Sequence, residues 1–385
     1  MIRFAGYEIL GLLSEGVNAL VYRVRVDDGT TAVLKVARGD RDRSLAELRH
    51  EQELVARLPP EDAVQVLRVV DTEPQAALLR EDFGAVSLRE HVRGKLSVDA
   101  FLPLALRLAD LLVAVHSRGI IHKDVNPQNV LIAPETGTIK LTDFSCSALL
   151  DREAAALLAP DELVGTLPYM APEQTGRMPR GIDARADLYS LGVVFYEFLA
   201  GVRPFRSSDP LQLIHAHLAQ VPPRLDEVDP TIPPAVAAIV ARLLAKDVEA
   251  RYQSALGLRS DLDACAAQLR ERGAIDDDFV LGLADTSPLF RIPERLYGRD
   301  AELARLEEAL ERCAAGRCEL ALIAGASGIG KSALVRELQR SIAERRGHFV
   351  AGKFDQYNRS VPFAALLQTL RQLIDLVLAG SDAEV

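Results

Sequence analysis

Four short sequence runs follow one another in the middle of the chain and constrain its fold more than any other feature. They are HKDVNPQN at 122–129, DFS at 143–145, GTLPYMAPE at 165–173 and DLYSLG at 187–192. A lone Asp or Asn in such a run is usually a turn residue. Four runs in this order and at this spacing are very specific, because chance does not produce them together.

The four runs resemble the signature set of protein kinases, and the resemblance covers about two-thirds of the chain. It implies a bilobal α+β fold and transfer of the γ-phosphoryl group of ATP. That reaction needs a group that aligns a hydroxyl and cations that hold the triphosphate. By this resemblance Asp124 orients the substrate hydroxyl and accepts its proton. Asn129 and Asp143 supply the hard oxygen ligands that Mg²⁺ prefers, so ATP and Mg²⁺ are the implied cofactors.

A lysine and a glutamate upstream match a further family feature. The run AVLK ends a strand-like segment at Lys35, which corresponds to the lysine that holds the α- and β-phosphates. In the following run ELRHEQEL, Glu51 is the expected ion-pair partner of this lysine. Glu47 and Glu53 remain alternatives, because only the register of the fold decides between them.

The glycine-rich loop of the family is eroded in this chain. In the run SEGVNALVY, Gly16 is retained, while Ser14 and Ala19 occupy the other two glycine positions. Glycine lets the backbone approach phosphates closely, so we expect a looser or differently shaped cover here. The nucleotide-binding residues that the resemblance implies in this lobe, besides Lys35 and Glu51, are Ser14, Gly16, Val21, Glu81 and Phe83.

Three other positions depart from the family pattern. Ser145 replaces the glycine that follows Asp-Phe. Asn126 replaces a lysine that contacts the γ-phosphate in the family. Its amide is expected to donate to phosphate and act in catalysis. Alternatively, Asn126 is a turn residue that forms hydrogen bonds within its own loop, ahead of Pro127. Arg80 stands where an apolar residue is usual, so it is expected to face an acid such as Asp82 unless the register is shifted by one.

Several residues have expected positions in and below the activation segment, 143–173. Thr166 matches a threonine that contacts the catalytic aspartate, Arg251 is expected to pair with Glu173, and Asp187 is expected to brace the catalytic loop. Lys123 replaces an arginine that would bind a phosphorylated loop, and lysine lacks the bidentate fork. We therefore expect control by attached domains rather than by phosphorylation of this segment.

The chain after the kinase-like region carries a second nucleotide-binding motif. GASGIGKS at 325–332 follows an apolar segment, 319–324, expected to be a buried strand, and precedes a helical pattern over 331–345. This is the P-loop pattern, in which backbone N–H groups cradle phosphates at a helix N-terminus. The expected nucleotide-binding residues are Gly325, Gly328, Gly330, Lys331 and Ser332, with Ser332 also as a Mg²⁺ ligand.

The P-loop region lacks a second feature of ATPases. No run of four apolar residues followed by an acid occurs after Ser332, and Asp375 lies inside an apolar helical pattern. The chain stops 53 residues after Ser332, which is expected to be the middle of a domain. We therefore expect nucleotide binding without hydrolysis by this part, and ATPase activity remains open.

These patterns predict the organisation of the chain. Local patterns favour strands at 7–12, 20–26 and 31–37, with a hairpin turn at Asp28-Gly29, a helix over 43–58 and a helix from about 98 that stops at Gly119. The expected domains are a kinase-like domain at 1–268 (small lobe about 1–84, large lobe about 85–268), a linker at 269–295 and the start of an α/β P-loop ATPase domain at 296–385.

The order of these parts resembles the N-terminal part of large bacterial signalling proteins. Those proteins join a serine/threonine kinase to a signal-transduction ATPase, often a GAF-type sensor and frequently a C-terminal histidine kinase. The run LYGRDAEL at 296–303 resembles the opening motif of such ATPases. The resemblance implies a protein substrate with Ser or Thr hydroxyls and downstream ATPase, sensor and histidine kinase modules. A pseudokinase that senses nucleotide or binds protein is the alternative, favoured by Ser145, Asn126 and Arg80.

Composition excludes other classes of function. The net charge of −10 argues against a general binder of nucleic acid or anionic membranes, which needs a basic surface. The most apolar stretches, 102–115 and 191–202, are too short to span a bilayer, and the N-terminus has no signal-peptide layout. The four cysteines show no C-x-x-C spacing. We expect a cytoplasmic protein with no membrane span and no nucleic-acid partner.

Overall fold

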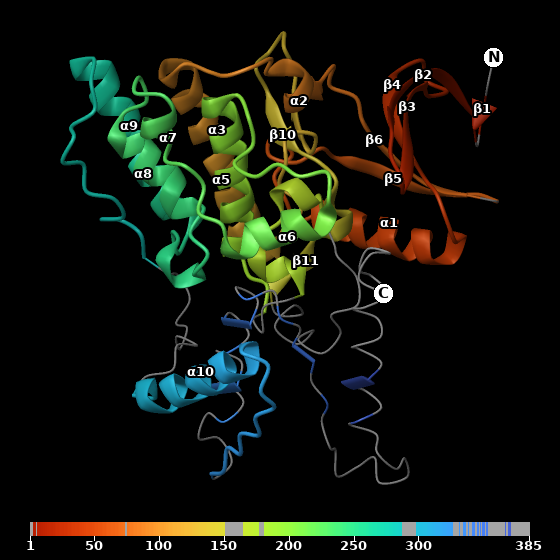
Figure 1. The fold of residues 1–385 in the computed structure, drawn as a ribbon. Coiled ribbons are helices and arrows are strands. Elements are labelled where there is room, and N and C mark those ends of the chain that lie inside the picture. Colours follow the sequence, from red (N-terminus) through yellow and green to blue (C-terminus); the bar gives the residue numbers. More distant parts are fainter. Residues whose placement is uncertain are drawn as a thin grey trace. The chain divides into compact units, whose positions relative to one another are not determined.

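The chain divides near residue 290 into two compact units, which are described separately. The computed structural model describes residues 3–4, 6–73, 75–150, 165–176, 181–286, 298–325, 331, 334–335, 338, 341–342, 345, 347, 349–350, 352, 366 and 369–370. The first unit holds a small sheet-rich lobe and a larger helical lobe (Figure 1).

The small lobe is a six-stranded antiparallel sheet in the order β1-β2-β3-β4-β6-β5. The hairpin expected at Asp28-Gly29 is confirmed, since it joins β3 to β4 and Arg25 pairs with Thr31 at its base. The elements of this lobe are β1 (Arg3–Phe4), β2 (Tyr7–Glu15), β3 (Ala19–Arg25), β4 (Thr31–Ala37), α1 (Arg41–Val55), β5 (Val66–Asp71) and β6 (Ala76–Glu81).

Helix α1 packs on one face of the sheet (Figure 1). Leu45 and Leu48 of α1 form an apolar cluster with Ala76 and Leu78 of β6. Successive residues of a strand point to opposite faces, so every second residue of β6 faces the helix. Arg80 continues this series, which places a charged side chain on the face that α1 covers.

Capping side chains set where the helices begin and end. At the start of α1, Asp40 accepts a hydrogen bond from the Arg43 N–H at 2.9 Å. At the start of α3, Ser97 caps the Ala100 N–H in the same way. Such caps satisfy backbone donors that have no partner inside the helix. The expected stop at Gly119 is confirmed, because this glycine follows α3 with a φ of 67°, a conformation that glycine adopts at no steric cost.

The large lobe is mostly helical, with three short strand pairs beside its helices. Its elements are β7 (Val86–Ser87), α2 (Leu88–His91), α3 (Val98–Ser117), β8 (Ile120–Ile121), β9 (Val130–Ile132), β10 (Ile139–Leu141), η1 (Phe144–Cys146), β11 (Ala148–Leu149), η2 (Leu167–Tyr169), η3 (Pro172–Thr175), α5 (Arg185–Ala200), α6 (Pro210–Ala219), α7 (Leu225–Val228), α8 (Pro234–Leu243), η4 (Val248–Ala250) and α9 (Ala255–Arg272).

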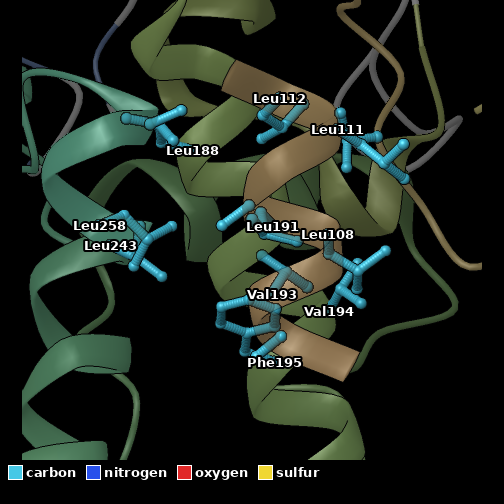
Figure 2. Packing of buried hydrophobic residues seen from close by; sticks show 14 of the residues in the cluster. Leu108, Leu111, Leu112, Leu188, Leu191, Val193, Val194, Phe195, Leu243 and Leu258 are labelled. Carbon is cyan, nitrogen blue, oxygen red and sulfur yellow. The ribbon is translucent and has the colours of Figure 1, made fainter. Parts of the chain in front are cut away.

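Helix α5 is the centre of the large-lobe core, and 14 of its residues are buried. Figure 2 shows side chains of α3 and α5 packed together, with Leu243 of α8 and Leu258 of α9 in the same cluster. A Cβ atom at Gly192 would lie 2.6 Å from the Cβ of Leu243, so the close approach of α5 and α8 requires glycine there. The run DLYSLG therefore marks a buried helix.

Part of the segment that the sequence assigns to a linker packs on the large lobe. Helix α9 continues to Arg272, and Phe279 and Leu281 beyond it contact the large-lobe core. The carboxylate of Asp285 is buried at the start of α9, where it accepts from the backbone N–H groups of Gln253 at 2.9 Å and Ser254 at 3.1 Å.

Two further contacts hold Asp285. Arg242 of α8 donates to its carboxylate at 2.9 Å. A Cβ atom at Gly257 of α9 would lie 2.2 Å from one of its oxygens, so the glycine makes room for the carboxylate. A negative charge at a helix N-terminus also interacts favourably with the helix dipole. Asp285 thus anchors the end of this segment to the large lobe.

The second unit contains one long helix among its described residues. Helix α10 (Asp300–Ala314) carries Leu303, Leu306 and Leu310 at the three- and four-residue spacing of one helix face. Of the described residues in 331–345, all but Arg345 are helical, as expected. No helix of the described residues, in either unit, combines the length and apolar character needed to cross a bilayer.

The expectation of a buried strand at 319–324 is wrong in this structure. These residues form no strand, and Leu320 and Leu322 are 86% and 88% exposed. A strand needs backbone partners on a neighbouring strand, and a parallel strand is stable only when both of its faces are covered. None of the described residues of this unit supplies such a neighbour.

We expect Asp285→Ala to lower the free energy of unfolding of the first unit by about 2–3 kcal/mol, because hydrogen bonds to charged groups each contribute about 1.5–3 kcal/mol. Urea denaturation followed by circular dichroism measures this. The matched control is Asp276→Ala in the same segment, whose exposed pair with Arg272 should be worth about 0.5 kcal/mol or less. Equal denaturation midpoints for the two variants would contradict the anchor.

Candidate active site

The loop between β8 and β9 holds the carboxylate of Asp124 in one orientation. One oxygen accepts from the Thr166 backbone N–H at 2.7 Å, and the other accepts from the Asn129 amide at 2.7 Å. The same Asn129 amide also donates to the Asp124 carbonyl at 2.9 Å. Two segments far apart in sequence thus fix this half-buried acid, and the expected contact between Thr166 and Asp124 is present.

Asn126 supports Asp124 from inside the loop. Its amide nitrogen donates to the Asp124 carboxylate at 3.0 Å and to the Thr166 hydroxyl at 3.1 Å, while its oxygen accepts from the Gln128 N–H at 2.9 Å. The side chain is only 1% exposed. This corrects the expectation of a phosphate contact, because both ends of the amide are engaged within the protein. The alternative of a residue that bonds its own loop is the arrangement found.

A buried lysine connects the sheet, α1 and the residue that begins the run DFS. Lys35 of β4 donates to Glu51 of α1 at 3.1 Å and to Asp143 at 2.6 Å. The expected ion pair between Lys35 and Glu51 is therefore present, and the register is correct. Glu47 and Glu53, the two alternatives, are exposed on other sides of α1.

Burial and charge act in opposite directions on the ionisation of this cluster. Burial by itself would lower the pKa of Lys35, but the carboxylates of Glu51 and Asp143 outweigh it and raise that pKa. Burial would likewise raise the pKa of Asp143, but Lys35 and Arg80 hold it well below its usual range. Lys35 and Asp143 are therefore both charged at neutral pH.

Arg80 lies in the same buried cluster, which differs from the expectation that it faces Asp82. Its guanidinium forms an ion pair with Glu51 and donates to the Thr142 hydroxyl at 2.9 Å. Asp82 instead pairs with Arg23 of β3 at 2.7 Å. The reason is the alternation of β6, which directs Arg80 toward α1 rather than along the chain.

The backbone at Asp143 adopts the left-handed conformation, with a φ of 62°. Ser145, at the position of the family glycine, donates its hydroxyl to the Asp143 carboxylate at 2.8 Å. This bond and that of Lys35 both go to the same oxygen, Oδ1. Ser145 therefore stabilises the orientation of the carboxylate.

The oxygens of Asp143 and Asn129 fit the expected metal. Among the described residues, no hydrogen bond or ion pair occupies Oδ2 of Asp143 or Oδ1 of Asn129, and the Asp143 side chain keeps 32% of its exposure. Carboxylate and amide oxygens are the ligands that Mg²⁺ prefers. These two side chains could hold Mg²⁺ together with phosphates and water.

The turn between β2 and β3 forms the eroded glycine-rich loop. Ser14 pairs with Val21 across the two strands, and the Gly16 N–H donates to the Ala19 carbonyl at 2.9 Å. Arg38 donates to the Gly16 carbonyl at 3.1 Å and so braces the tip of the turn. This contact of Arg38 is not among those expected from the sequence. The hairpin register offered a signal, since it places the residue after β4 beside this turn.

The segment that leaves β6 carries two further expected nucleotide contacts. The Glu81 carboxylate accepts from the Gln65 N–H at 2.7 Å and from Lys140 at 2.7 Å. The same Lys140 ammonium lies 4.9 Å from the centre of the Phe83 ring. The Glu81 carboxylate is thus paired within the protein, and Lys140 fixes both residues.

The hydroxyl groups of the activation segment are all engaged in internal hydrogen bonds. The segment 143–173 contains four such residues, Ser145, Ser147, Thr166 and Tyr169. Ser145 donates to Asp143, Ser147 to a backbone carbonyl at 2.9 Å, and Tyr169 to Glu197 at 2.5 Å. The Thr166 hydroxyl accepts from Asn126. Each of these groups therefore has a structural role in the observed fold.

Two buried charged contacts support the loop from below, as the resemblance implies. Asp187 of α5 accepts from the backbone N–H groups of His122 and Lys123, both at 2.8 Å. Arg251 binds both oxygens of Glu173, at 2.7 and 3.0 Å. Bidentate pairs of this kind are strong and directional, so the catalytic loop and the end of the activation segment are held in place.

The second nucleotide motif is described only in part. Lys331 donates to the Gly325 carbonyl at 2.8 Å. Gly328, Gly330 and Ser332 lie outside the described residues. The nucleotide-binding roles of these five residues therefore stay predictions.

Comparison with known proteins agrees with this geometry. The model of the protein kinase domain family matches residues 7–261, and that of the AAA ATPase domain family matches residues 295–385. The chain belongs to the protein kinase domain family. Its second part matches the ATPase family that the P-loop motif indicates.

The relatives of this chain include a histidine kinase and serine/threonine kinases. The hybrid signal transduction histidine kinase G of Dictyostelium discoideum is 29% identical over 376 residues, covering 75% of this chain and 11% of that protein. Serine/threonine-protein kinase Pkn1 of Myxococcus xanthus is 34% identical over 211 residues, covering 54% of this chain and 30% of that protein. The chain thus spans less than a third of each of these two relatives.

Among solved structures, the PknI kinase domain of Mycobacterium tuberculosis matches 68% of this chain and 97% of its own length. The TM-score is 0.52 and the sequence identity is 24%. This likeness shows that the first unit has the protein kinase fold, as the sequence predicts.

We expect Asn126→Lys to slow phosphoryl transfer at least tenfold, a barrier increase of about 1.4 kcal/mol. The ammonium cannot accept from the Gln128 N–H, and it displaces a buried amide that orients Asp124. Single-turnover transfer from saturating ATP measures this, with Gln128→Lys as the exposed control in the same loop. A faster, folded Asn126→Lys variant would restore the phosphate-contact interpretation.

Proposed function

We propose that the first unit is an active serine/threonine protein kinase, which transfers the γ-phosphoryl group of ATP to hydroxyl groups of proteins. The observation that carries the proposal is the simultaneous placement of Asp124, Lys35 and Asp143 in oriented, hydrogen-bonded positions. Phosphoryl transfer needs positioning and charge stabilisation more than covalent chemistry.

Asp124 is the residue that orients the attacking hydroxyl. Both of its oxygens already accept hydrogen bonds from fixed donors, so the carboxylate is held rather than free to rotate. A hydroxyl that donates to this carboxylate has its oxygen directed at the γ-phosphoryl group. As the new bond to phosphorus forms, the bond to the bridging oxygen of ATP breaks, ADP leaves and the carboxylate accepts the hydroxyl proton. Pro127 and Thr166 favour a serine/threonine kinase over a tyrosine kinase.

Lys35, together with the Mg²⁺ that Asn129 and Asp143 would hold, compensates the negative charge of ATP in this proposal. Lys35 is the cation for the α- and β-phosphates, and the pair with Glu51 holds its ammonium in place. Mg²⁺, bound by Asn129 and Asp143, would neutralise phosphate charge during the reaction. In this proposal the nucleotide is surrounded by residues of the glycine-rich loop and of the segment that leaves β6, namely Ser14, Gly16, Val21, Glu81 and Phe83.

The departures that favour a pseudokinase do not remove any of these groups. Ser145 donates to Asp143 without occupying its second oxygen. Arg80 binds one oxygen of Glu51, and Lys35 binds the other. Asn126 supports Asp124. The geometry therefore supports the active kinase over the alternative.

The remaining expectations extend the proposal beyond the kinase unit. We propose that Lys331 and the residues around it form a second nucleotide site, and that the natural context includes a sensor module and a histidine kinase module. The name of the Dictyostelium relative supports the histidine kinase. The proposed location is the cytoplasm. The domain limits of 1–268 and 296–385 remain part of this proposal. Of the intervening segment, 269–295, the residues up to Asp285 belong with the large lobe, because they continue α9 and pack on its core.

We expect Asp124→Asn to lower phosphate transfer to a generic basic protein by at least a hundredfold, since the amide cannot accept the proton. Transfer of radiolabel from ATP by the full chain is the assay. Nucleotide affinity, measured by calorimetry, should change less than threefold, because Asp124 does not hold phosphates. Equal transfer by wild type and Asp124→Asn would contradict the proposal and favour the pseudokinase.

We expect Asp143→Ala to abolish magnesium-dependent nucleotide binding at the kinase site, because a ligand and a partner of Lys35 are lost together. Lys331→Ala should leave that site unchanged, since effects at separate sites add. Nucleotide titrations of the two single variants and the double variant test this. The two-site interpretation fails if Lys331→Ala weakens the kinase site as much as Asp143→Ala does.

A further inference from the structure

Arg80 is an arginine buried beside the nucleotide site, on the face of β6 that α1 covers. Its side chain is 7% exposed, although arginine is almost never buried without a partner. Neighbouring β4 and β5 pair with it on both sides through Val33 and Val66. Arg80 therefore lies on an interior strand of the sheet, whose backbone is held by hydrogen-bonded neighbours on both sides.

The guanidinium reaches two elements at once. One nitrogen forms an ion pair with Oε1 of Glu51, and another donates to the Thr142 hydroxyl at 2.9 Å. Thr142 directly precedes Asp143. The planar, forked guanidinium can hold two acceptors in fixed directions, which a lysine ammonium does less well. Arg80 thus ties α1 to the segment that carries the expected metal ligand.

Glu51 is the acceptor on which these contacts converge. Its Oε2 accepts from Lys35 at 3.1 Å, and its Oε1 accepts from the Phe144 backbone N–H at 3.3 Å as well as from Arg80. The side chain is 1% exposed. Two cations, Lys35 and Arg80, balance two anions, Glu51 and Asp143. Without Arg80, one lysine would have to serve the buried carboxylate of Glu51 and the half-buried carboxylate of Asp143.

We propose that Arg80 is a positioning residue for phosphoryl transfer, which holds Glu51 and α1 in the place that presents Lys35 to the nucleotide. The inference rests on the proposed kinase function. In this proposal Arg80 fixes α1 to β6, so α1 stays docked whenever the unit is folded.

The state of the activation segment agrees with this assignment. All four of its hydroxyl groups are engaged in internal hydrogen bonds, and Lys123 lacks the fork that would bind a phosphorylated segment. A phosphate on this segment is therefore not needed to bring α1 into place. The ion pair between Arg80 of β6 and Glu51 of α1 holds the helix against the sheet instead.

The test uses the full chain and compares Arg80→Met with wild type. Methionine fills the same space without charge. The control is Arg41→Met, which removes an ion pair between α1 and Asp71 of β5 at the exposed rim of the same helix. Steady-state phosphorylation gives kcat and the KM for ATP, and hydrogen exchange reports the protection of the backbone amides of α1.

We expect Arg80→Met to lower kcat at least tenfold, with less than a threefold change in the KM for ATP, because the residues proposed to surround the nucleotide are unaltered. Exchange of the α1 amides should be at least tenfold faster. Arg41→Met should stay within twofold of wild type in both measurements. Unchanged exchange and kcat in a folded Arg80→Met variant would overturn the proposal.

A double-mutant cycle separates positioning from a general structural role. If Arg80 acts through Glu51, then Arg80→Met should add less than twofold to the loss of kcat in a Glu51→Gln background. If the fold-losses of kcat in the two single variants multiply in the double variant, the proposal is overturned. If Arg80→Met does not fold, Thr142→Val replaces it, because this variant removes only the second acceptor of Arg80. It should lower kcat and speed the exchange of the α1 amides by two- to fivefold. No change in either measurement would contradict the role of Arg80 in docking α1.

The exchange measurement distinguishes this inference from the proposed function. If wild type transfers no phosphate, the kinase proposal fails, yet faster α1 exchange in Arg80→Met would still show that Arg80 docks the helix. If wild type transfers phosphate and Arg80→Met matches it in both readouts, the kinase proposal stands and this inference fails.

Discussion

The arrangement of the nucleotide-binding half of the kinase unit depends on the carboxylate of Glu51. A carboxylate that is 1% exposed is costly unless charged partners surround it, and removing one partner of such a buried pair costs about 3–5 kcal/mol. Its partners come from β4, β6 and the start of η1. Satisfying this one group therefore brings the sheet, α1 and the residues around Asp143 into a single arrangement, which is also the arrangement that phosphoryl transfer requires.

Apolar packing alone could not produce that precision. The contacts of Leu45 and Leu48 with β6 hold α1 on the sheet, but the hydrophobic effect is non-directional and tolerates small shifts of a helix. The ion pairs of Glu51 have fixed directions and lengths, so they select one position among those that packing allows. The large lobe follows the same division, because the buried helix α5 supplies the core and the pair of Arg251 with Glu173 sets the position of the activation segment.

The sequence predicted the contacts whose chemistry is visible in residue type and spacing. The kinase fold, the pair of Lys35 with Glu51 and the pair of Arg251 with Glu173 belong to this group. The direction of Arg80 could not be predicted, since it depends on which face of β6 the residue occupies and a shift of one residue reverses that face. The phosphate contact expected for Asn126 was wrong because a long lysine side chain can extend out of the loop toward phosphate, whereas the short amide of asparagine forms hydrogen bonds within the loop. The strand expected at 319–324 failed because strands depend on neighbours that local sequence does not reveal.

The end of the activation segment is also connected to the segment that follows α9. Asp285 accepts from the Gln253 N–H, Gln253 donates to the Arg251 carbonyl at 2.8 Å, and Arg251 holds Glu173. Each link is a hydrogen bond in a largely buried region, so the position of the interdomain segment and that of Glu173 share a network. Since Arg251 also fixes Glu173, a displacement of Asp285 would act through this network on the end of the activation segment.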